Sequence, residues 1–359
     1  MADTRIAEAV KAALAAVDVP GGGTLASYGG LSDIIVTTGA VAFAISVAPG
    51  MEKAFAPART AAQQAAERVA EGRKVMVSVT ADRQPATAAQ SRTTPRPGPA
   101  PREAVPGIRH IIAVGSGKGG VGKSTVSANL ALAFAAEGLR TGLLDADLYG
   151  PSVPRLLGLE GRPVARDDGI FAPHEAFGLK AMSIGSMLTP DQAVVWRGPM
   201  ATSALRQLLR ETDWGGLDVL VVDLPPGTGD IQISLVQQVP LLGAVVVSTP
   251  QDLALIDAKK AMDMLRRTGV PLLGLVENMS YFIAPDTGRR YDIFGHGGAR
   301  TAAAKADIPF LGEIPLVMAI RESSDSGRPV VATDPDGQEA RVFRGIAAEL
   351  LRRLPQLRA

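Results

Sequence analysis

The chain of 359 residues contains no cysteine. This absence excludes disulfide bonds, a thiol nucleophile and any zinc or iron–sulfur site ligated by cysteines of this chain. Aromatic residues make up only 4% of the sequence, and the formal net charge is +1. The chain thus lacks both a broad positive field to hold nucleic acid and a supply of aromatic rings for base stacking. We therefore expect no nucleic-acid partner.

Long hydrophobic runs are also missing. No apolar stretch reaches the roughly 18 residues that span a bilayer. The N-terminal sequence MADTRIAEAVKAALAAVDVPGGG carries Asp3 and Glu8 within its apolar pattern and has no basic segment. This pattern is typical of an amphipathic helix rather than of a signal peptide. We expect no membrane span and a cytoplasmic location.

The chain divides into three segments. Residues 84–106 are rich in Pro, Ala, Ser, Thr and Arg and show no hydrophobic period, which predicts a linker. The linker separates a small N-terminal unit, residues 1–83, from a large unit, residues 107–359. The small unit is predicted to be an α/β sandwich, because helical and strand-like patterns alternate in it. Its expected elements are helices over 5–16 and 54–72, a hairpin over 33–47 that is broken at TTG, and a strand over 74–79.

In the large unit, apolar strand patterns alternate with helical patterns. This order predicts a doubly wound α/β domain with a mostly parallel sheet covered by helices on both faces. The expected strands are 110–116, 141–147, 217–225, 243–250 and 271–279, and expected helices include 124–138 and 252–269.

The stretch SGKGGVGKST, residues 116–125, follows an apolar strand pattern and begins a helical one. Its spacing is that of a phosphate-binding loop, in which backbone amides and a helix N-terminus converge on phosphate oxygens. Lys123 is the candidate to bridge the β- and γ-phosphates of ATP, and Ser124 the candidate to ligate Mg²⁺. The residues predicted to bind nucleotide here are Gly117, Lys118, Gly119, Gly120, Val121, Gly122, Lys123, Ser124 and Thr125.

Two further strand patterns end in aspartates. LVVDLPPGTGD places Asp223 where it can hold Mg²⁺ through water, before a glycine-rich loop able to respond to the γ-phosphate. LLDADLYGPS places Asp145 and Asp147 at another strand end, on the same side of the strand. Asp145 is the candidate metal-side residue, and Asp147 the candidate for orienting the attacking water. Alternatively, one of the two caps the following turn.

Several motifs together resemble a known family. KGGVGKST, with Lys118 after the first glycine, resembles the deviant phosphate loop of the group that contains MinD, ParA and the nitrogenase iron protein. DADLYGPSVPRLLG, DLPPGTGD, VENMSYF and FGHGGA, in this order, resemble the Mrp/ApbC family of iron–sulfur cluster carrier ATPases. The resemblance covers about residues 107–351. The N-terminal unit resembles the assembly-factor domain that often precedes this ATPase in bacteria.

The resemblance implies a homodimeric ATPase that converts ATP and water to ADP and phosphate during iron–sulfur cluster assembly or transfer. Lys118 would reach the phosphates bound by the other subunit and stabilise charge there, as an arginine finger does. An ordinary solvated lysine is the alternative. Asn278 would bind adenine, because its carboxamide offers a donor and an acceptor. The implied partners are assembly factors or apo-protein clients.

One motif departs from the family. After ENMSYF, members that carry a cluster have a Cys-x-x-Cys pair, whereas this chain has Ala284 and Thr287. Neither residue can ligate iron as a thiolate does, so binding of an iron–sulfur cluster is in doubt. The carboxylates nearby suit hard cations, and His296 is expected to form hydrogen bonds within its loop.

Other functions stay open. An ATP-dependent positioning or partner-binding switch of the MinD/ParA type would carry no cluster. Its mark would be a surface for membrane or DNA, and the C-terminal sequence EARVFRGIAAELLRRLPQL is basic and amphipathic. Such a helix more often docks on its own domain, which is our expectation here. A P-loop ligase or kinase is a third class, but no second substrate site is visible in the sequence.

Overall fold

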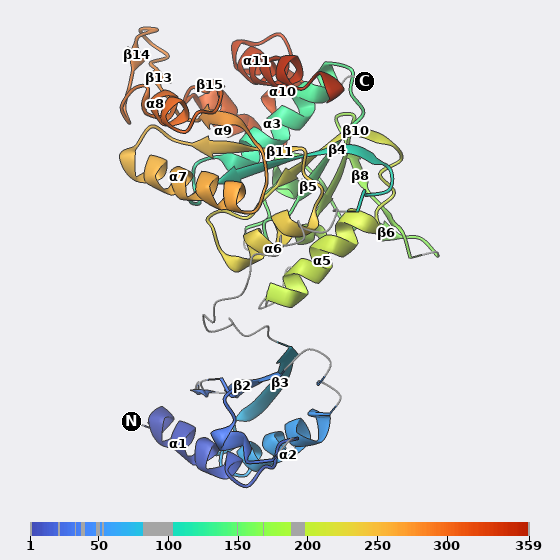
Figure 1. Cartoon of the computed structure of the whole chain (residues 1–359). Coiled ribbons are helices and arrows are strands. Elements are labelled where there is room, and N and C mark those ends of the chain that lie inside the picture. The colour runs from blue at the N-terminus through green and yellow to red at the C-terminus, as the bar shows by residue number, and fades with distance from the viewer. Residues whose placement is uncertain are drawn as a thin grey trace, which may run out of the picture. The chain divides into compact units, whose positions relative to one another are not determined.

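The structure is a computed structural model of the whole chain (Figure 1). It describes residues 2–20, 22–32, 34–36, 40–47, 51, 54–81, 103–148, 150–167, 169–187 and 198–357. Contacts divide the chain into two compact units, Met1–Pro97 and Gly98–Ala359. The expected linker, residues 84–106, lies outside the described residues as far as residue 102.

The N-terminal unit packs two helices against one face of a small sheet. Along the first helix, Ile6, Val10 and Leu14 follow the helical period and are buried. The first two strands pair antiparallel, with Ile35 opposite Ala42, which confirms the expected hairpin; its TTG turn is not among the described residues. The elements are α1 (Ala2–Leu14), the 3₁₀ turn η1 (Leu25–Ser27), β1 (Ile35–Val36), β2 (Ala40–Val47), α2 (Ala56–Glu67) and β3 (Lys74–Ala81).

The large unit is built around an eight-stranded sheet in the order β15-β12-β11-β4-β10-β5-β9-β8. All neighbouring strands are parallel except β8 and β9, so the predicted doubly wound, mostly parallel sheet is confirmed. The strands are β4 (Ile108–Ser116), β5 (Thr141–Asp145), β8 (His174–Ala176), β9 (Leu179–Ser183), β10 (Leu217–Asp223), β11 (Gly243–Ser248), β12 (Leu272–Glu277) and β15 (Phe310–Glu313). Two small pairs lie outside it, β6 (Val164–Ala165) with β7 (Phe171–Ala172), and β13 (Phe282–Ile283) with β14 (Arg290–Tyr291).

Helices cover both faces of this sheet. On one face, α3, α4, α10 and α11 enclose one apolar cluster, and on the other α5 to α8 enclose a second. None of the described helices is long and apolar enough to cross a membrane. The helices are α3 (Lys123–Ala136), α4 (Val153–Leu156), α5 (Gly198–Arg210), α6 (Asp230–Gln238), α7 (Asp252–Arg267), α8 (Gly298–Lys305), α9 (Met318–Asp325), α10 (Val330–Thr333) and α11 (Gln338–Arg353), with short 3₁₀ turns η2 (Ile184–Met187) and η3 (Pro355–Leu357).

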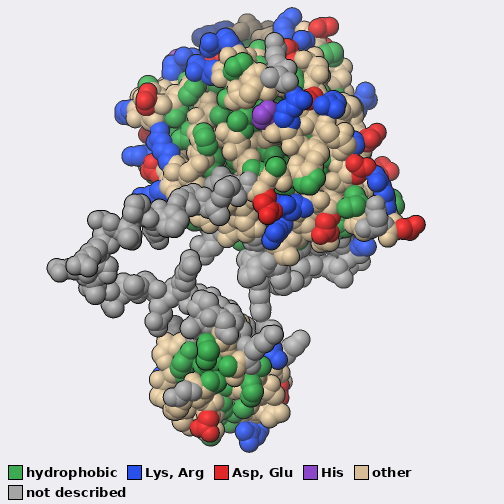
Figure 2. All heavy atoms as spheres, turned by 45° about the vertical axis from the view of Figure 1, so that its right-hand side comes forward, with side chains coloured by type: hydrophobic (Ala, Val, Ile, Leu, Met, Phe, Trp, Pro, Cys, Tyr) green, Lys and Arg blue, Asp and Glu red, His purple; other side chains and the backbone are tan. Residues whose placement is uncertain are grey.

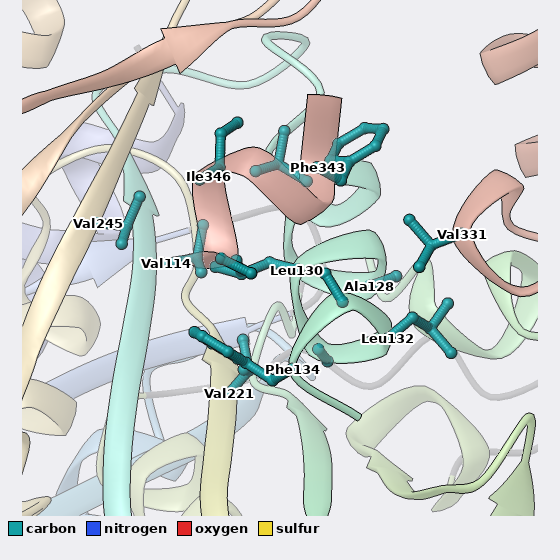
Figure 3. Packing of buried hydrophobic residues seen from close by; sticks show 14 of the residues in the cluster. Val114, Ala128, Leu130, Leu132, Phe134, Val221, Val245, Val331, Phe343 and Ile346 are labelled. Carbon is teal, nitrogen blue, oxygen red and sulfur yellow. The ribbon is translucent and has the colours of Figure 1, made fainter. Parts of the chain in front are cut away.

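The central helix α3 is buried on nearly every side. The sheet covers one side of it, where Phe134 of α3 lies beside Val221 of β10, and α10 and α11 cover the other, where Phe343 and Ile346 of α11 belong to the same apolar cluster (Figure 3). The apolar face of α11 is therefore used within its own unit, as expected, and is not presented to a membrane. Burial on both sides explains why α3 is apolar well beyond a single helical face.

On the surface of the large unit, basic and acidic side chains are interspersed over the face that Figure 2 shows. The two signs occur in nearly equal number in the chain, with 37 Lys and Arg against 36 Asp and Glu. No single sign dominates that face.

Candidate nucleotide-binding site

The glycine-rich loop connects the central strand β4 to the N-terminus of α3, where the sequence places it. Gly120 and Gly122 both have φ near +79°, a left-handed conformation that strains other residues. A Cβ on Gly117 would lie 2.0 Å from the carbonyl carbon of Asp257 in α7. The first glycine therefore lets the loop pack directly on the α7 backbone, while glycines 120 and 122 allow its turns.

The concave side of the loop is open. A Cβ added to Gly119 or Gly120 would meet no atom within 4 Å. Gly122 is the N-cap of α3, so the positive end of this helix and its unpaired amides lie at the loop. An open cradle at a helix N-terminus is the arrangement that binds phosphate.

Asp223 at the end of β10 gathers the polar side chains of the loop. The Lys123 ammonium lies 2.8 Å from its Oδ1. Ser124 Oγ donates to Oδ2 at 2.5 Å, and Ser127 Oγ donates to Oδ1 at 2.7 Å. Asp223 and Ser127 are fully buried, and Lys123 is 6% exposed. The structure thus joins the lysine, serine and strand-end aspartate that the sequence singled out, and adds Ser127, which the loop motif does not mark.

Asp145 at the end of β5 lies next to this cluster and is fully buried. Its carboxylate accepts hydrogen bonds from Ser183 Oγ (2.9 Å) and from the backbone amides of Asp147 (3.1 Å) and Val153 (3.1 Å). Burial, and then the charge of Asp223, raise the pKa of Asp145 above its ordinary value. The three hydrogen bonds act in the opposite direction.

Asp147 lies two residues past the end of β5, which stops at Asp145 rather than at the expected residue 147. Its Oδ2 is 3.6 Å from the Lys123 ammonium, and its Oδ1 accepts from the Gly150 amide at 3.3 Å. Each of the two aspartates therefore takes part in the turn after β5. Capping a turn and facing Lys123 are not alternatives for Asp147, since it does both.

The loop after β10 is tied to the phosphate loop. The Gly227 amide donates to the Ser116 carbonyl at 2.9 Å, and the Ala146 amide donates to the Asp223 carbonyl at 2.9 Å. The ends of β4, β5 and β10 are thereby held together.

Asn278 follows β12 and reaches the other side of the phosphate loop. Its Nδ2 donates to the Val121 carbonyl at 2.8 Å, and a Cβ on Gly122 would lie 2.2 Å from that nitrogen. Asn278 and Gly122 also line a cavity of about 450 Å³ that extends to residues 315–317, which follow β15, and to α9. Thr125 lines the same cavity, so the structure places the predicted base-binding residue beside the predicted phosphate cradle.

Lys118 lies at the rim of the loop and is partly exposed. Its carbonyl accepts from Ser116 Oγ at 2.9 Å, which fixes the backbone. Its ammonium has no hydrogen bond or ion pair with any residue that the structure describes. Lys118 therefore differs from the buried and paired Lys123.

Ala284 and Thr287 lie in the connection between β13 and β14. The Ala284 amide donates to the Arg289 carbonyl at 3.0 Å, and the Gly288 amide donates to the Ala284 carbonyl at 2.8 Å. The strand pair is thus a closed hairpin, hereafter the 282–291 hairpin. Throughout the described part of the chain, no three His, Asp or Glu residues lie close enough together to hold a metal ion.

Arg290 anchors this hairpin to the sheet. Its guanidinium stacks 4.0 Å over the Tyr281 ring, donates to Asp292 Oδ1 at 2.9 Å and lies 3.4 Å from Glu313 Oε2 at the end of β15. His296 Nδ1 is within hydrogen-bond distance of the same guanidinium, at 3.0 Å. His296 is thus a hydrogen-bonding residue of its loop, as expected.

Comparison with known proteins gives the same assignment for both units. The family described as NUBPL iron-transfer P-loop NTPase matches residues 107–351, and the family described as iron-sulfur cluster assembly protein matches residues 7–79. The iron-sulfur cluster carrier protein of Deinococcus radiodurans is 52% identical over 252 residues, which are 70% of this chain and 71% of that protein.

Two solved structures are similar to the large unit. A nucleotide-binding protein in complex with ADP from Archaeoglobus fulgidus is 41% identical, with a TM-score of 0.57 over 66% of this chain and 92% of that one. The cell division ATPase MinD of Pyrococcus furiosus, 24% identical with a TM-score of 0.52 over 68% and 99% of the two chains, shares the fold. These matches confirm the resemblance that the motifs indicated: the chain belongs to the family of NUBPL iron-transfer P-loop NTPases.

Proposed function

We propose that this chain binds ATP with Mg²⁺, hydrolyses it, and acts in the assembly or transfer of iron–sulfur clusters. The observation that carries the ATPase is the contact of Lys123 and Ser124 with Asp223 at 2.8 and 2.5 Å. In P-loop enzymes, the lysine that binds phosphate, the serine that binds the metal and the aspartate at the strand end meet in this way. The ADP complex of the Archaeoglobus fulgidus relative supports a nucleotide as the ligand.

The residues at this cluster fit magnesium. Mg²⁺ prefers oxygen ligands and keeps several waters, and Ser124 Oγ with the Asp223 carboxylate offers such a set. Asp145 adds a second buried carboxylate nearby. Bound Mg²⁺ would neutralise charge on the phosphates. The chain's own residues would position it: Ser124 as a ligand, Asp223 through water, and Asp145 from the metal side.

Lys123 changes partners in this proposal. Its ammonium lies on Asp223 and Asp147 in the present structure. With nucleotide in the cradle it turns to the β- and γ-phosphates, which leaves Asp223 for the metal side and Asp147 for a water. Asp147 is then placed to accept a hydrogen bond from the water that attacks the γ-phosphate. Asn278, turned from Val121, would contact adenine in the adjoining cavity.

The chain is proposed to act as a homodimer, with Lys118 supplied to the partner's nucleotide. A partly exposed ammonium without a partner in the described residues is available for that purpose. We also propose that the functional division of the chain is 1–83, 84–106 and 107–359, as the sequence indicates. The two family matches, 7–79 and 107–351, lie within the first and last segments.

The cluster is cargo in this proposal, and the chain does not supply the thiolates that hold it. The similar protein of Deinococcus radiodurans is named an iron-sulfur cluster carrier protein, which supports a role of this chain in cluster assembly or transfer. Because the chain has no cysteine, ligands must come from a partner protein or a thiol cofactor. The same absence favours a second candidate function, an ATP-dependent switch that binds partners and carries no cluster. Anaerobic reconstitution with iron and sulfide, with and without an assembly-factor partner, separates the two by iron content and visible absorption.

The ATPase itself is tested at Lys123. We expect Lys123→Ala to abolish Mg-ATP hydrolysis, because no other described cation occupies the centre of the cradle. Lys305→Ala, an exposed lysine of α8, is the matched control and should hydrolyse ATP at the normal rate. Turnover is measured as phosphate release. Normal hydrolysis in Lys123→Ala would refute the assignment of this loop.

A further inference from the structure

A second cavity lies between α5 and α6, away from the phosphate loop. Its volume is about 320 Å³, within the range of small-molecule sites. Figure 1 shows the two helices side by side on one face of the large sheet. Neither the phosphate loop nor Asn278 lines this cavity.

The walls of this α5–α6 cavity combine apolar side chains from the sheet, α5 and α6 with two polar ones, Gln237 and Gln238 at the end of α6. Leu144 of β5 and Val222 of β10 line the sheet side. Leu205 and Leu209 of α5, and Leu235 of α6, line the other sides. Each of these apolar side chains is less than 5% exposed, so the apolar walls belong to the core of the unit. A ligand here must bring an apolar body of its own.

Charged groups line the same cavity beside the apolar walls. Arg206 and Arg210, one turn apart on α5, both line it, and Glu103 is the one acidic residue among its lining. Arg210 lies 3.1 Å from the Glu103 carboxylate, whose side chain is 74% exposed. Arg206 has no hydrogen bond or ion pair with the residues that the structure describes. The lining therefore has one more positive than negative charge. Arg210 already pairs with one carboxylate, that of Glu103, and this exposed ion pair is weak.

We propose that the α5–α6 cavity binds a small amphipathic carboxylate, with its apolar body between the helices and its carboxylate on Arg206 and Arg210. Arginine suits this head group because its guanidinium donates two parallel hydrogen bonds to a carboxylate. The buried leucines and Val222 outnumber the two glutamines of the lining and favour a hydrocarbon chain over a sugar or a nucleotide, whose many polar groups would find too few partners there. The bound carboxylate replaces Glu103 on Arg210 and gives Arg206 a partner.

The test uses straight-chain fatty carboxylates titrated calorimetrically into the full-length protein. From hexanoate to octanoate to decanoate, affinity should rise about fourfold per methylene, as expected for burial of the chain. Octanol, which has the chain but no charge, should bind at least about tenfold more weakly than octanoate. One carboxylate molecule should bind per protein chain.

Two kinds of variant show where the ligand lies. Arg206→Glu with Arg210→Glu reverses the charge at exposed or half-exposed positions and should weaken octanoate at least about tenfold. Val239→Phe places a larger side chain in the lining and should weaken decanoate more than hexanoate. Arg341→Glu on the exposed side of α11 is the control and should leave binding unchanged. The proposal is overturned if no carboxylate binds, if affinity is independent of chain length, or if the α5 double variant binds as well as the control.

Discussion

Asp223 receives a lysine and two serines on one carboxylate, and no exposed surface remains to it. Removing its charge leaves Lys123 without its closest anion and takes the carboxylate from the metal side. The Asp223→Asn variant keeps the size of the side chain. Its effects therefore report the loss of the charge and of one hydrogen-bond acceptor rather than a change of size.

We expect Asp223→Asn to retain nucleotide binding, because the backbone cradle is intact, and to lose Mg²⁺-dependent turnover on the order of 100-fold or more. Nucleotide affinity and phosphate release are measured on the same preparation. Asp263→Asn on α7, which has no hydrogen bond or ion pair with other described residues, should match the wild type. If Asp223→Asn turns ATP over normally, Asp223 holds the loop together but does not serve the metal.

Some of these residues could be named from the sequence and others could not. Lys123, Ser124 and Asp223 belong to motifs whose spacing is dictated by phosphate and metal geometry. Ser127 and Ser183 also bind the buried aspartates, at 2.7 and 2.9 Å, yet each is an ordinary serine in an apolar stretch. Only the fold brings Ser183 in β9 to Asp145 in β5. A periodicity signal could not have identified it.

Among the elements, β5 and β10 are joined where both strands begin. Asp218 in β10 accepts hydrogen bonds from Arg140, which directly precedes β5, at 2.9 Å from Nη2 and 3.1 Å from Nε. These bonds outweigh the effect of burial and lower the pKa of Asp218 to about 2. An unfolded aspartate titrates near 3.9. The pair therefore stabilises the fold above about pH 4, and this contribution is lost as the pH falls toward 2.

We expect Asp218→Asn to be less stable than the wild type at pH 6. The difference in the free energy of unfolding between the two proteins should become smaller between pH 4 and 3. Urea unfolding followed by tryptophan fluorescence measures this, because both tryptophans, Trp196 and Trp214, belong to the large unit. The control variant Asp263→Asn should have the same free energy of unfolding as the wild type at every pH in this range. A difference of constant size across this range would mean that the loss comes from packing rather than from the charge of Asp218.

The 282–291 hairpin has Ala284 and Thr287 where the resemblance implies cysteines. Backbone bonds between Ala284 and Arg289 close it, and Arg290 fixes it to β15. We expect the double variant Ala284→Cys with Thr287→Cys to take up iron and sulfide as a dimer, since thiolates then stand at the positions used in the family. Iron content and visible absorption after anaerobic reconstitution and gel filtration are the measurements.

The matched variant for this hairpin is Ala284→Ser with Thr287→Ser, which should stay colourless like the natural chain. A stable cluster on the natural chain would show that other ligands suffice. If neither the natural chain nor the cysteine variant binds a cluster, the hairpin has lost the geometry as well as the thiols. The switch that carries no cluster would then be the better account.

Helices with a strong period and strands with long apolar runs were predicted well, whereas short strands that exist only through their pairing were not. The expected helix 252–269 corresponds to α7, Asp252–Arg267, because its apolar positions repeat with the helical period. β15, in contrast, has four residues and was not predicted; it exists because it pairs with β12. The strand order also could not be read from the sequence, since it depends on which edges meet.

At the scale of the whole molecule, the proposed role of Lys118 requires two chains. We expect Lys118→Ala to lower the turnover number by about 1,000-fold or more while nucleotide affinity changes little, as for loss of a cation supplied in trans. Turnover per subunit should rise with protein concentration if the active form is a dimer.

Mixing experiments separate trans from cis action. Subunits with Lys118→Ala should regain part of their activity when mixed with subunits carrying Lys123→Ala, because the mixed dimer then contains one complete site. Mixtures of Lys118→Ala with Lys305→Ala subunits control for dilution and concentration. Activity that never exceeds the sum of the separate variants would assign Lys118 to its own site or to the backbone turn that its carbonyl fixes.

The ion pair between Lys123 and Asp223 sets a condition on any anion that binds at the loop. A phosphate that takes the lysine leaves a fully buried carboxylate without a cation, which is costly. In the proposed function, a metal bound with the nucleotide would place a cation beside Asp223 again, whereas nucleotide alone would not. We therefore expect the proposed site to favour nucleotide and metal together over nucleotide alone, and over free phosphate that brings no metal.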